Sequence, residues 1–452
     1  MADSRRGPAA HGQTGAEIAQ SQTGAEIAQS QTGAEIAQSQ TGAEIAHWRL
    51  AAEALADLDT VAAHEAWAAL EDYLQRNVRA RLAGMVAELV AEAAALQRAY
   101  DGGPDPDRAR SGVLRLRGRY LQVETILDFY GDAVNSRTNP RLRALLLGFD
   151  TLAGDSMAAI LNQAGIDVPL ALVYLDTGLG AAILEAGVRL WDHGHPSPAA
   201  AIKLTRHNLS YPTALLHETG HQVAHLTGWN TELAAALGER LAPRSAELTA
   251  VWQGWTHEVA ADVHAFAQAG WAPTAALINV VDGGTPAVYR MQLGDPHPFP
   301  FVRVLFNVAL CRRWFGAGPW DDVAAAWMQR HPLEAAAPAV RAITNASLAA
   351  LDDIVDVCTR QPMAAFQGRP LCAVLDPRRV SPAALGALAR QAGPSLLSSA
   401  YLRRREPLRI LALLASRAVT DSARAGEHRD HLLAWVADVG ADPGTTTRAR
   451  AA

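Results

Sequence analysis

Five consecutive residues, HETGH at 217–221, combine two histidines with a glutamate. Pro212 suits the first turn of a helix, so we predict that the motif lies in a helix. His217 and His221 are four residues apart, so their imidazoles share one helix face about 6 Å apart along the axis and can bind one zinc ion. Glu218 would lie beside the metal, where it can take a proton from a zinc-bound water. The alternative is a pair of ordinary helix histidines held by their neighbours.

Gly220 lies between the glutamate and the second histidine. A glycine inside a helix costs about 1 kcal/mol relative to alanine. We therefore expect another part of the chain to pack closely against the helix at this position.

The third metal ligand decides the class of site. His225 lies eight residues after His217, roughly 12 Å along a helix, which is too far to share one zinc ion. A site with a third histidine would need glycine at 224 and histidine at 227, and the sequence has Ala224 and Thr227. His225 is therefore interpreted as an ordinary residue on the helix face.

Two acids downstream supply a candidate for that ligand. Glu258 and Asp262 are four residues apart in EVAAD, on one face of a second predicted helix. Glu258 can complete a site of two histidines and one glutamate, and Asp262 can accept a hydrogen bond from the free ring N–H of a ligating histidine. Taken alone, the pair would be a solvated helix face. Three acids between the two helices lack an acidic partner four residues on: Glu232, Glu239 and Glu247.

A third element is DPHPFPFVRV at 295–304, with a helix expected to begin near Phe301. His297 could donate a hydrogen bond to the developing oxyanion of a substrate carbonyl. The alternative for this segment is a structural turn, with Arg303 forming an ion pair with an acid such as Asp262.

The three motifs together resemble a known family. HETGH, EVAAD and HPFPFVR follow in the order of the HExxH, ExxAD and HPxxxxR motifs of the gluzincin family of CaaX-prenyl-endopeptidase and heat-shock membrane proteases. The resemblance covers roughly residues 166–310. It implies His217, His221 and Glu258 as zinc ligands and Glu218 as general base.

By the same resemblance, Asp262 would orient a ligand, and His297 and Arg303 would flank the cleft. The stretch 202–206 would be the edge strand to which an extended peptide adds. Members of the family are typically embedded in membranes, whereas we find no run of about 18 apolar residues in this sequence. The resemblance therefore supports a zincin core and its mechanism rather than prenylated or membrane-protein substrates.

The remaining sequence predicts a mainly helical protein with a small sheet. Helical spacing of apolar residues runs through 47–165, with a loop at 101–110 and a break at Asn139-Pro140. Short apolar, β-branched runs predict strands at 168–175, 183–191 and 202–205. A helical pattern of apolar residues begins again at Pro212 and continues to the end of the sequence, with loops expected at 362–370 and 376–382.

The first 46 residues carry the nine-residue unit QTGAEIAQS three times without variation, followed by a truncated copy. Each unit offers a single isoleucine for burial, so we expect a flexible tail or a marginal helix; an array that contacts an unknown partner is the alternative. The expected organisation is a repeat-containing tail at 1–46, a helical region at 47–165, a zincin-like core at 166–330 and a helical region at 331–452.

Charge and cysteine content limit which partners and which cellular compartment we expect for the protein. The formal net charge is -6, and no basic stripe of the kind that nucleic-acid binding needs is present. The three cysteines, Cys311, Cys358 and Cys372, are too scattered for a disulfide framework or a cysteine-based zinc site. The first residues do not resemble a secretory signal. We expect a cytoplasmic protein that is not inserted in a membrane.

The sequence therefore predicts an α+β, predominantly helical fold with a zincin-like core. It predicts a zinc-dependent endopeptidase that acts on protein or peptide substrates. Two alternatives remain open: a non-catalytic helical scaffold that retains a zincin core, and a zinc hydrolase acting on a non-peptide amide.

Overall fold

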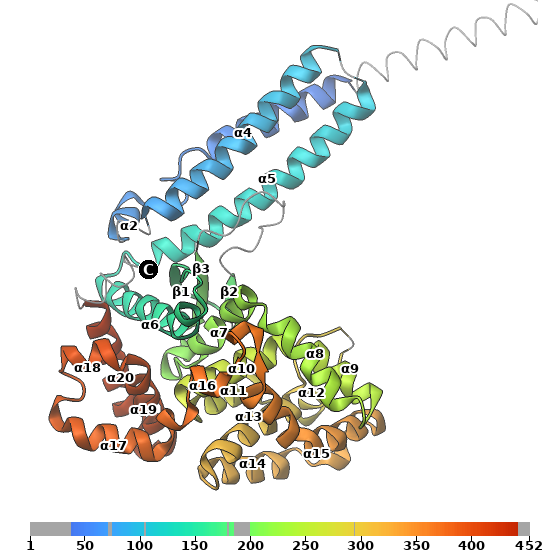
Figure 1. The fold of residues 1–452 in the computed structure, drawn as a ribbon. Helices are drawn as coiled ribbons and strands as arrows, with labels where there is room; N and C mark the ends of the chain where they lie inside the picture. Colours follow the sequence, from blue (N-terminus) through green and yellow to red (C-terminus); the bar gives the residue numbers. More distant parts are fainter. Residues whose placement is uncertain are drawn as a thin grey trace, which may run out of the picture. The chain divides into compact units, whose positions relative to one another are not determined.

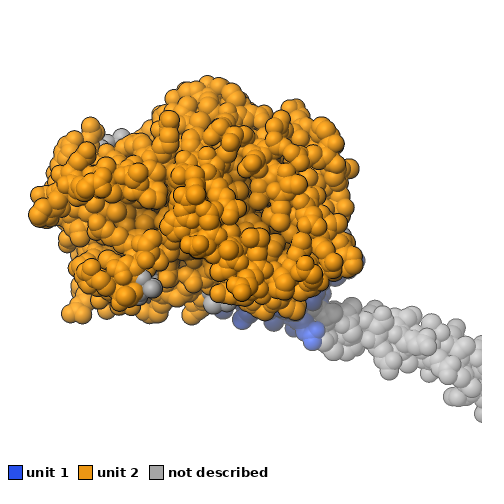
Figure 2. All heavy atoms as spheres, turned by 90° about the horizontal axis from the view of Figure 1, so that it is seen from below, with its two compact units in different colours: residues 1–61, 81–128 blue, residues 62–80, 129–452 orange. Residues whose placement is uncertain are grey.

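A computed structural model describes residues 38–70, 75–103, 105–178, 180–184, 199–292 and 294–441. The described chain is predominantly helical and contains a small sheet, as predicted (Figure 1). Its contacts divide it into two compact units, coloured separately in Figure 2. The first takes the described parts of 1–61 and 81–128, and the second takes those of 62–80 and 129–452. The boundaries expected at 165 and 330 both fall inside the second unit.

The first unit is a group of helices. A helix at 38–54 accompanies α4 (Ala80–Asp101) and the larger part of α5 (Pro106–Asn135). The turn between α4 and α5 falls in the loop predicted at 101–110. Apolar residues three or four positions apart on α4 are buried, which is the pattern of a helix with one packed face: Leu82, Val86, Leu89 and Ala93.

The truncated repeat copy is part of this unit. Residues 40–46 lie within the helix 38–54, and Ile45 is fully buried. Gly42 lies against the Tyr100 ring, and Glu44 forms an ion pair with Arg110. Of the two expectations for the repeats, a flexible tail or a marginal helix, this copy matches the helix, and neighbouring helices supply the apolar surface that the repeat itself lacks. The residues before 38 lie outside the described part of the chain.

The larger sheet of the second unit has three strands in the order β1-β3-β2, and β4 (Pro362–Met363) and β5 (Arg369–Pro370) form a separate two-stranded sheet. The strand β1 (Ala171–Asp176) pairs in parallel with β3 (Ala200–Thr205), and β2 (Ala182–Leu184) pairs with β3 in the antiparallel sense. β3 is therefore the central strand, and the expectation that 202–206 forms the substrate-binding edge is wrong, because β2 covers that side. Residues 185–191 of the predicted second strand lie outside the described residues.

Capping residues define both ends of the helix α6 (Pro140–Ala164). The Asn139 side chain accepts hydrogen bonds from the first free backbone N–H groups, and Gly165 adopts the left-handed conformation at the end. α6 is also the one described helix that is long and apolar enough to cross a membrane, with 61% of its apolar window buried inside the protein.

A buried ion pair ties the start of α6 to the sheet. Arg137 donates to both carboxylate oxygens of Asp150, at 2.7 and 3.0 Å, and also to the carbonyl oxygen of Val173 in β1. Asp150 in turn accepts a hydrogen bond from the backbone N–H of Val173 at 2.7 Å. Every strong hydrogen-bonding group of the pair except the Arg137 Nε therefore has a partner.

The histidines of HETGH and the acids of EVAAD lie on the helices α7 (Ala214–Thr227) and α10 (Thr256–Ala269). They pack against each other at Gly220, where a methyl group would lie 2.8 Å from the Cα atom of Ala261 and 3.0 Å from the Cβ atom of His264. The close packing expected from this glycine is therefore present, and it brings the two motifs face to face.

One apolar core runs through the second unit, from α6 and the sheet to the last helix. α6 and α20 (Ala425–Ala441) pack closely at Gly148 and Gly440, because a methyl group at either glycine would clash with the backbone of the other helix. The region 331–452 therefore shares its core with the predicted zincin-like segment. The remaining α-helices are α2 (His64–Ala69), α8 (Trp229–Leu241), α9 (Ala246–Gly254), α11 (Ala272–Val281), α12 (Thr285–Val288), α13 (Pro300–Phe315), α14 (Pro319–Arg330), α15 (Pro338–Arg360), α16 (Leu371–Val374), α17 (Pro382–Ala392), α18 (Ala400–Arg405) and α19 (Pro407–Thr420). The other short helical segments are η1 (Gln75–Arg79), η2 (His207–Ser210), η3 (Leu333–Ala335), η4 (Ala364–Phe366), η5 (Pro377–Val380), η6 (Gly393–Ser395) and η7 (Ser422–Arg424).

Candidate metal centre

The packing of α7 against α10 brings together the three residues that the sequence singles out as metal ligands. One ligand atom from each of His217, His221 and Glu258 lies within 4.8 Å of the others. His221 and Glu258 are buried, and His217 is half-buried. His225 is exposed and does not belong to this group.

The ring atoms of this group converge on one point. The two Nε2 atoms of His217 and His221 are 3.1 Å apart. The carboxylate oxygens of Glu258 lie 3.3 Å from the first of these nitrogens and 3.5 Å from the second. Two imidazole nitrogens and one carboxylate are the donor set of catalytic zinc sites that keep a fourth position open, so these residues fit a zinc ion.

Asp262 fixes the orientation of the first histidine. Its Oδ1 atom lies 2.9 Å from Nδ1 of His217, so Nδ1 donates a proton to this hydrogen bond and Nε2 is the nitrogen that a metal would bind after Nε2 has lost its own proton. The structure thus has the hydrogen bond that the spacing of the two acids predicts. The Nδ1 atom of His221 has no partner within the described part of the chain.

Arg303 bridges the two acids. Its guanidinium donates to both oxygens of Asp262, at 2.9 and 2.8 Å, and lies 2.9 Å from Glu258. Asn307, one turn further along α13, donates to Asp262 at 3.1 Å. The ion pair between Arg303 and Asp262 was one of the two alternatives for this segment. Asn307 was missed, although its position four residues after Arg303 places it on the same helix face.

These contacts set the protonation of the group. Burial raises the pKa of Glu258 and Asp262, but the Arg303 guanidinium and the hydrogen bonds with His217 together outweigh burial, so both pKa values lie far below their usual range. Burial lowers the pKa of His217, yet hydrogen bonds with Asp262 and Glu258 raise it to about 10. Burial and the neighbouring His217 charge lower the pKa of His221. The metal-free site therefore holds two carboxylates, one charged histidine and one neutral histidine.

Glu218 differs from the other acids. Its side chain is buried at the border of the cavity, and among the described residues it makes no hydrogen bond or ion pair. Burial raises its pKa to about 7, against the opposing charge of His217. A carboxylate with a pKa near neutrality, free of partners and next to a metal-binding group can accept a proton and return it.

Two more histidines line the site. His297 lies 3.3 Å from Glu258 through its Nε2 atom, and its Nδ1 atom is 2.7 Å from Asp295. The ring of His257 stacks on that of His221, with centroids 4.2 Å apart and planes at 20°. Sequence reasoning missed His257, because a histidine next to Glu258 has no spacing signature and its stacking depends on how α7 and α10 cross.

The group opens into a cavity of about 490 Å³. His217, Glu218, His221 and Glu258 form one part of its lining, and apolar residues of α11 and the strand β2 form another. This size lies within the range of pockets that bind small molecules or peptide side chains.

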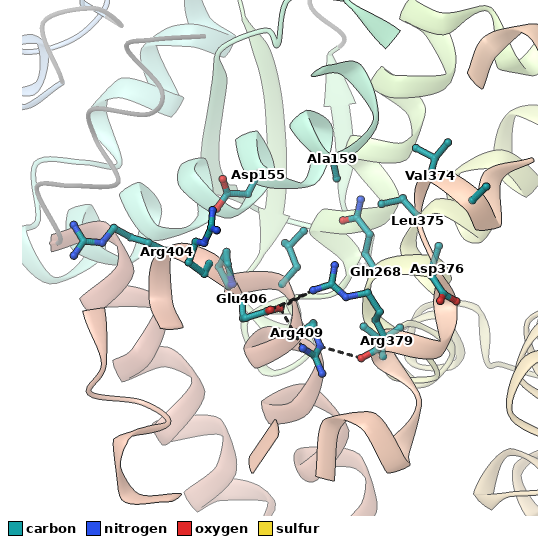
Figure 3. A pocket seen from close by; sticks show the side chains of 16 residues that line it. Asp155, Ala159, Gln268, Val374, Leu375, Asp376, Arg379, Arg404, Glu406 and Arg409 are labelled. Carbon is teal, nitrogen blue, oxygen red and sulfur yellow. Dashed lines mark hydrogen bonds and ion pairs between the residues drawn. The ribbon is translucent and has the colours of Figure 1, made fainter. Parts of the chain in front are cut away.

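A second cavity, of about 350 Å³, lies between α6, α10 and the segment 373–409 (Figure 3). Its charged side chains pair with one another: Glu406 lies 3.0 Å from Arg379 and 3.3 Å from Arg409. Glu406 thus neutralises part of the charge of Arg379 and Arg409, two of the arginines that line this cavity.

Comparison of the chain with protein-family models, with curated proteins and with solved structures gave no match.

Proposed function

We propose that this protein is a zinc-dependent endopeptidase of the gluzincin type. The observation that carries the proposal is the convergence of His217, His221 and Glu258 beside a buried, unpaired glutamate. A structural metal site would have no use for an unpaired Glu218 with a raised pKa at the border of a cavity.

A zinc ion held by the two histidines and Glu258 would supply a Lewis acid for the carbonyl group of the scissile bond. Glu218 takes a proton from water as the water oxygen attacks the carbonyl carbon. It then passes the proton to the amine nitrogen as the C–N bond breaks. Asp262 and Arg303 hold the ligands in place, and His297, at the mouth of the cavity, would donate a hydrogen bond to the carbonyl oxygen as negative charge develops on it.

Two other functions remain alternatives. A zinc hydrolase of a non-peptide amide would use the same groups, because the attack on the carbonyl is the same. A non-catalytic scaffold would keep the ligand set without the need for Glu218. The apolar cavity beside the ligands favours the peptidase, since it offers room for a substrate side chain.

The test is the variant Glu218→Gln, measured with a mixed peptide library and by metal analysis. Loss of the base should reduce hydrolysis by a factor of roughly 10² to 10⁴, and one zinc ion should remain bound. His221→Ala should lose the zinc as well. Equal activity of Glu218→Gln and the wild type would contradict the proposal. Peptide cleavage by the wild-type protein that continues after a chelator is added would exclude the zinc mechanism.

A further inference from the structure

The two histidines of the candidate metal centre differ in how the protein holds their rings. The Nδ1 atom of His217 is hydrogen-bonded to Asp262, and this bond fixes the ring. The Nδ1 atom of His221 is buried and has no hydrogen-bond partner within the described part of the chain. The usual means of orienting a ligating imidazole is therefore present for the first histidine and absent for the second.

The other ring nitrogen of His221 does not make up for this. Its Nε2 atom lies 3.1 Å from Nε2 of His217, and the two rings meet edge-on, with planes at 85°. Both Nε2 atoms also lie next to Glu258, so a metal ion held by the three residues would replace the proton between the two nitrogens. The contact with His217 therefore cannot orient His221 when it acts as a ligand.

The ring of His257 covers one face of the His221 ring. Their centroids are 4.2 Å apart, and their planes are inclined by only 20°. Atoms of neighbouring groups reach their optimal van der Waals separation at about 3.5–4.0 Å, so a ring stacked at this spacing has little room to tilt. Stacking thus limits the rotation of His221 and leaves its Nε2 atom free to bind a metal.

The elements that carry this stacked pair are packed against each other. His257 lies in the first turn of α10, directly before Glu258, and His221 follows Gly220, where α7 and α10 approach closely. The Nδ1 atom of His257 is 3.8 Å from Oε1 of Glu258, which is too long for a hydrogen bond. A side chain on a packed helix can hold its neighbour more precisely than a side chain on a loop.

We propose that His257 is a positioning residue of the metal centre, whose ring holds the imidazole of His221 in the orientation that a metal ligand needs. The inference rests on the proposed zinc-dependent function and assigns His257 no contact with the metal or the scissile bond. It requires a flat ring at position 257, whereas the ring nitrogens of His257 are dispensable.

The experiment measures zinc affinity, by competition with a chelator of known strength, in three variants of position 257. His257→Phe keeps a flat ring and should keep the wild-type affinity. His257→Ala and His257→Leu should bind zinc about 3- to 10-fold more weakly, since a contact between two aromatic rings contributes a factor of about this size. His225→Ala is the control, because it removes an exposed imidazole near the end of α7, and it should bind zinc as the wild type does.

The three variants separate stacking from two other roles. If His257→Leu binds zinc as well as His257→Phe does, the side chain at 257 only fills space, and the proposal is overturned. If His257→Phe loses as much affinity as His257→Ala, the nitrogens of His257 act instead, through Glu258. Wild-type affinity in all three variants would also overturn the proposal.

Cobalt bound in place of zinc gives a second readout, because its visible absorption bands depend on the geometry of the ligands. The wild type and His257→Phe should share one spectrum, and His257→Ala and His257→Leu should show shifted bands. Identical spectra of all four proteins would contradict the positioning role. The thermal midpoint of unfolding shows that each variant is folded.

The proposed function and the role of His257 can fail separately. If the wild-type protein binds neither zinc nor cobalt, the proposed function fails. NMR relaxation of the His221 ring in the metal-free proteins then tests the stacking by itself. Faster ring motion in His257→Ala and His257→Leu than in the wild type and His257→Phe supports the role of His257, and equal motion in all four refutes it.

Discussion

The Nδ1 atom of His217 lies 2.9 Å from Oδ1 of Asp262, on the side of the ring that faces away from His221 and Glu258. The same carboxylate accepts two hydrogen bonds from Arg303 and one from Asn307. A single buried acid therefore orients one of the candidate metal ligands and anchors α13 to α10.

We expect Asp262→Asn to weaken zinc binding by about 10- to 100-fold, because the amide leaves His217 without its charged partner and removes the fixed tautomer. The measurement is zinc affinity by competition with a chelator of known strength. Asp322→Asn, at an exposed position of α14, is the control and should keep the wild-type affinity. Unchanged affinity of Asp262→Asn would show that this acid acts on the packing of α13 alone.

Gly220→Ala should destabilise the second unit, although alanine is the better helix former. The added methyl group would meet the backbone of Ala261 at 2.8 Å, and overpacking of this kind costs about 1–3 kcal/mol. Gly154→Ala, within α6, is the matched control, because nothing lies within 4 Å of its new methyl group. The control should gain up to about 1 kcal/mol. Thermal midpoints of the two variants that shift in the same direction would contradict this account.

Arg137→Met should be among the most destabilising single changes in the second unit. It leaves the carboxylate of Asp150 buried without its ion pair, which costs about 3–5 kcal/mol. The double variant Arg137→Met with Asp150→Asn should recover part of the loss, since no buried charge remains and the amide oxygen can still accept from Val173. Denaturation midpoints check this order, and additive losses would contradict it.

Zinc binding should release a proton and strengthen as the pH rises. With its pKa raised to about 10, His217 carries a proton at neutral pH in the metal-free protein, and a metal ligand must give it up. His221 and Glu258 are already deprotonated, because their pKa values are lowered. Affinity should therefore rise about tenfold per pH unit above pH 7 and level off near pH 10. Titration calorimetry in buffers of different ionisation enthalpy counts the proton, and a count of zero would contradict the prediction.

The parts of the site that local spacing determines could be predicted from the sequence. Four-residue separations in HETGH and EVAAD place side chains on one helix face, and Gly220 marks the face that another element approaches. The structure adds what spacing cannot supply, namely that the two faces meet. His257 escaped prediction because its contact with His221 depends on the angle at which α7 and α10 cross.

The order of the strands in the sheet also could not be predicted from local sequence. The strands of the three-stranded sheet were predicted from their own apolar, β-branched residues, but the pairing of β1 with β3 depends on how residues far apart in the chain pack. The short strands β4 and β5 lie in the segment 362–370, which was predicted to be a loop. Arg137 was overlooked for a related reason: a basic residue in the turn before α6 gives no local sign that Asp150 and Val173 surround it.

The packed repeat copy in the first unit has a consequence for changes in the number of repeat units. Because the units are identical, loss or gain of a whole unit upstream of residue 38 regenerates the same residues at the junction with the helix 38–54. Ile45 and Glu44 would keep their contacts whatever the number of units. A change in the number of units by steps of nine residues would thus leave the sequence of the helix 38–54 as it is.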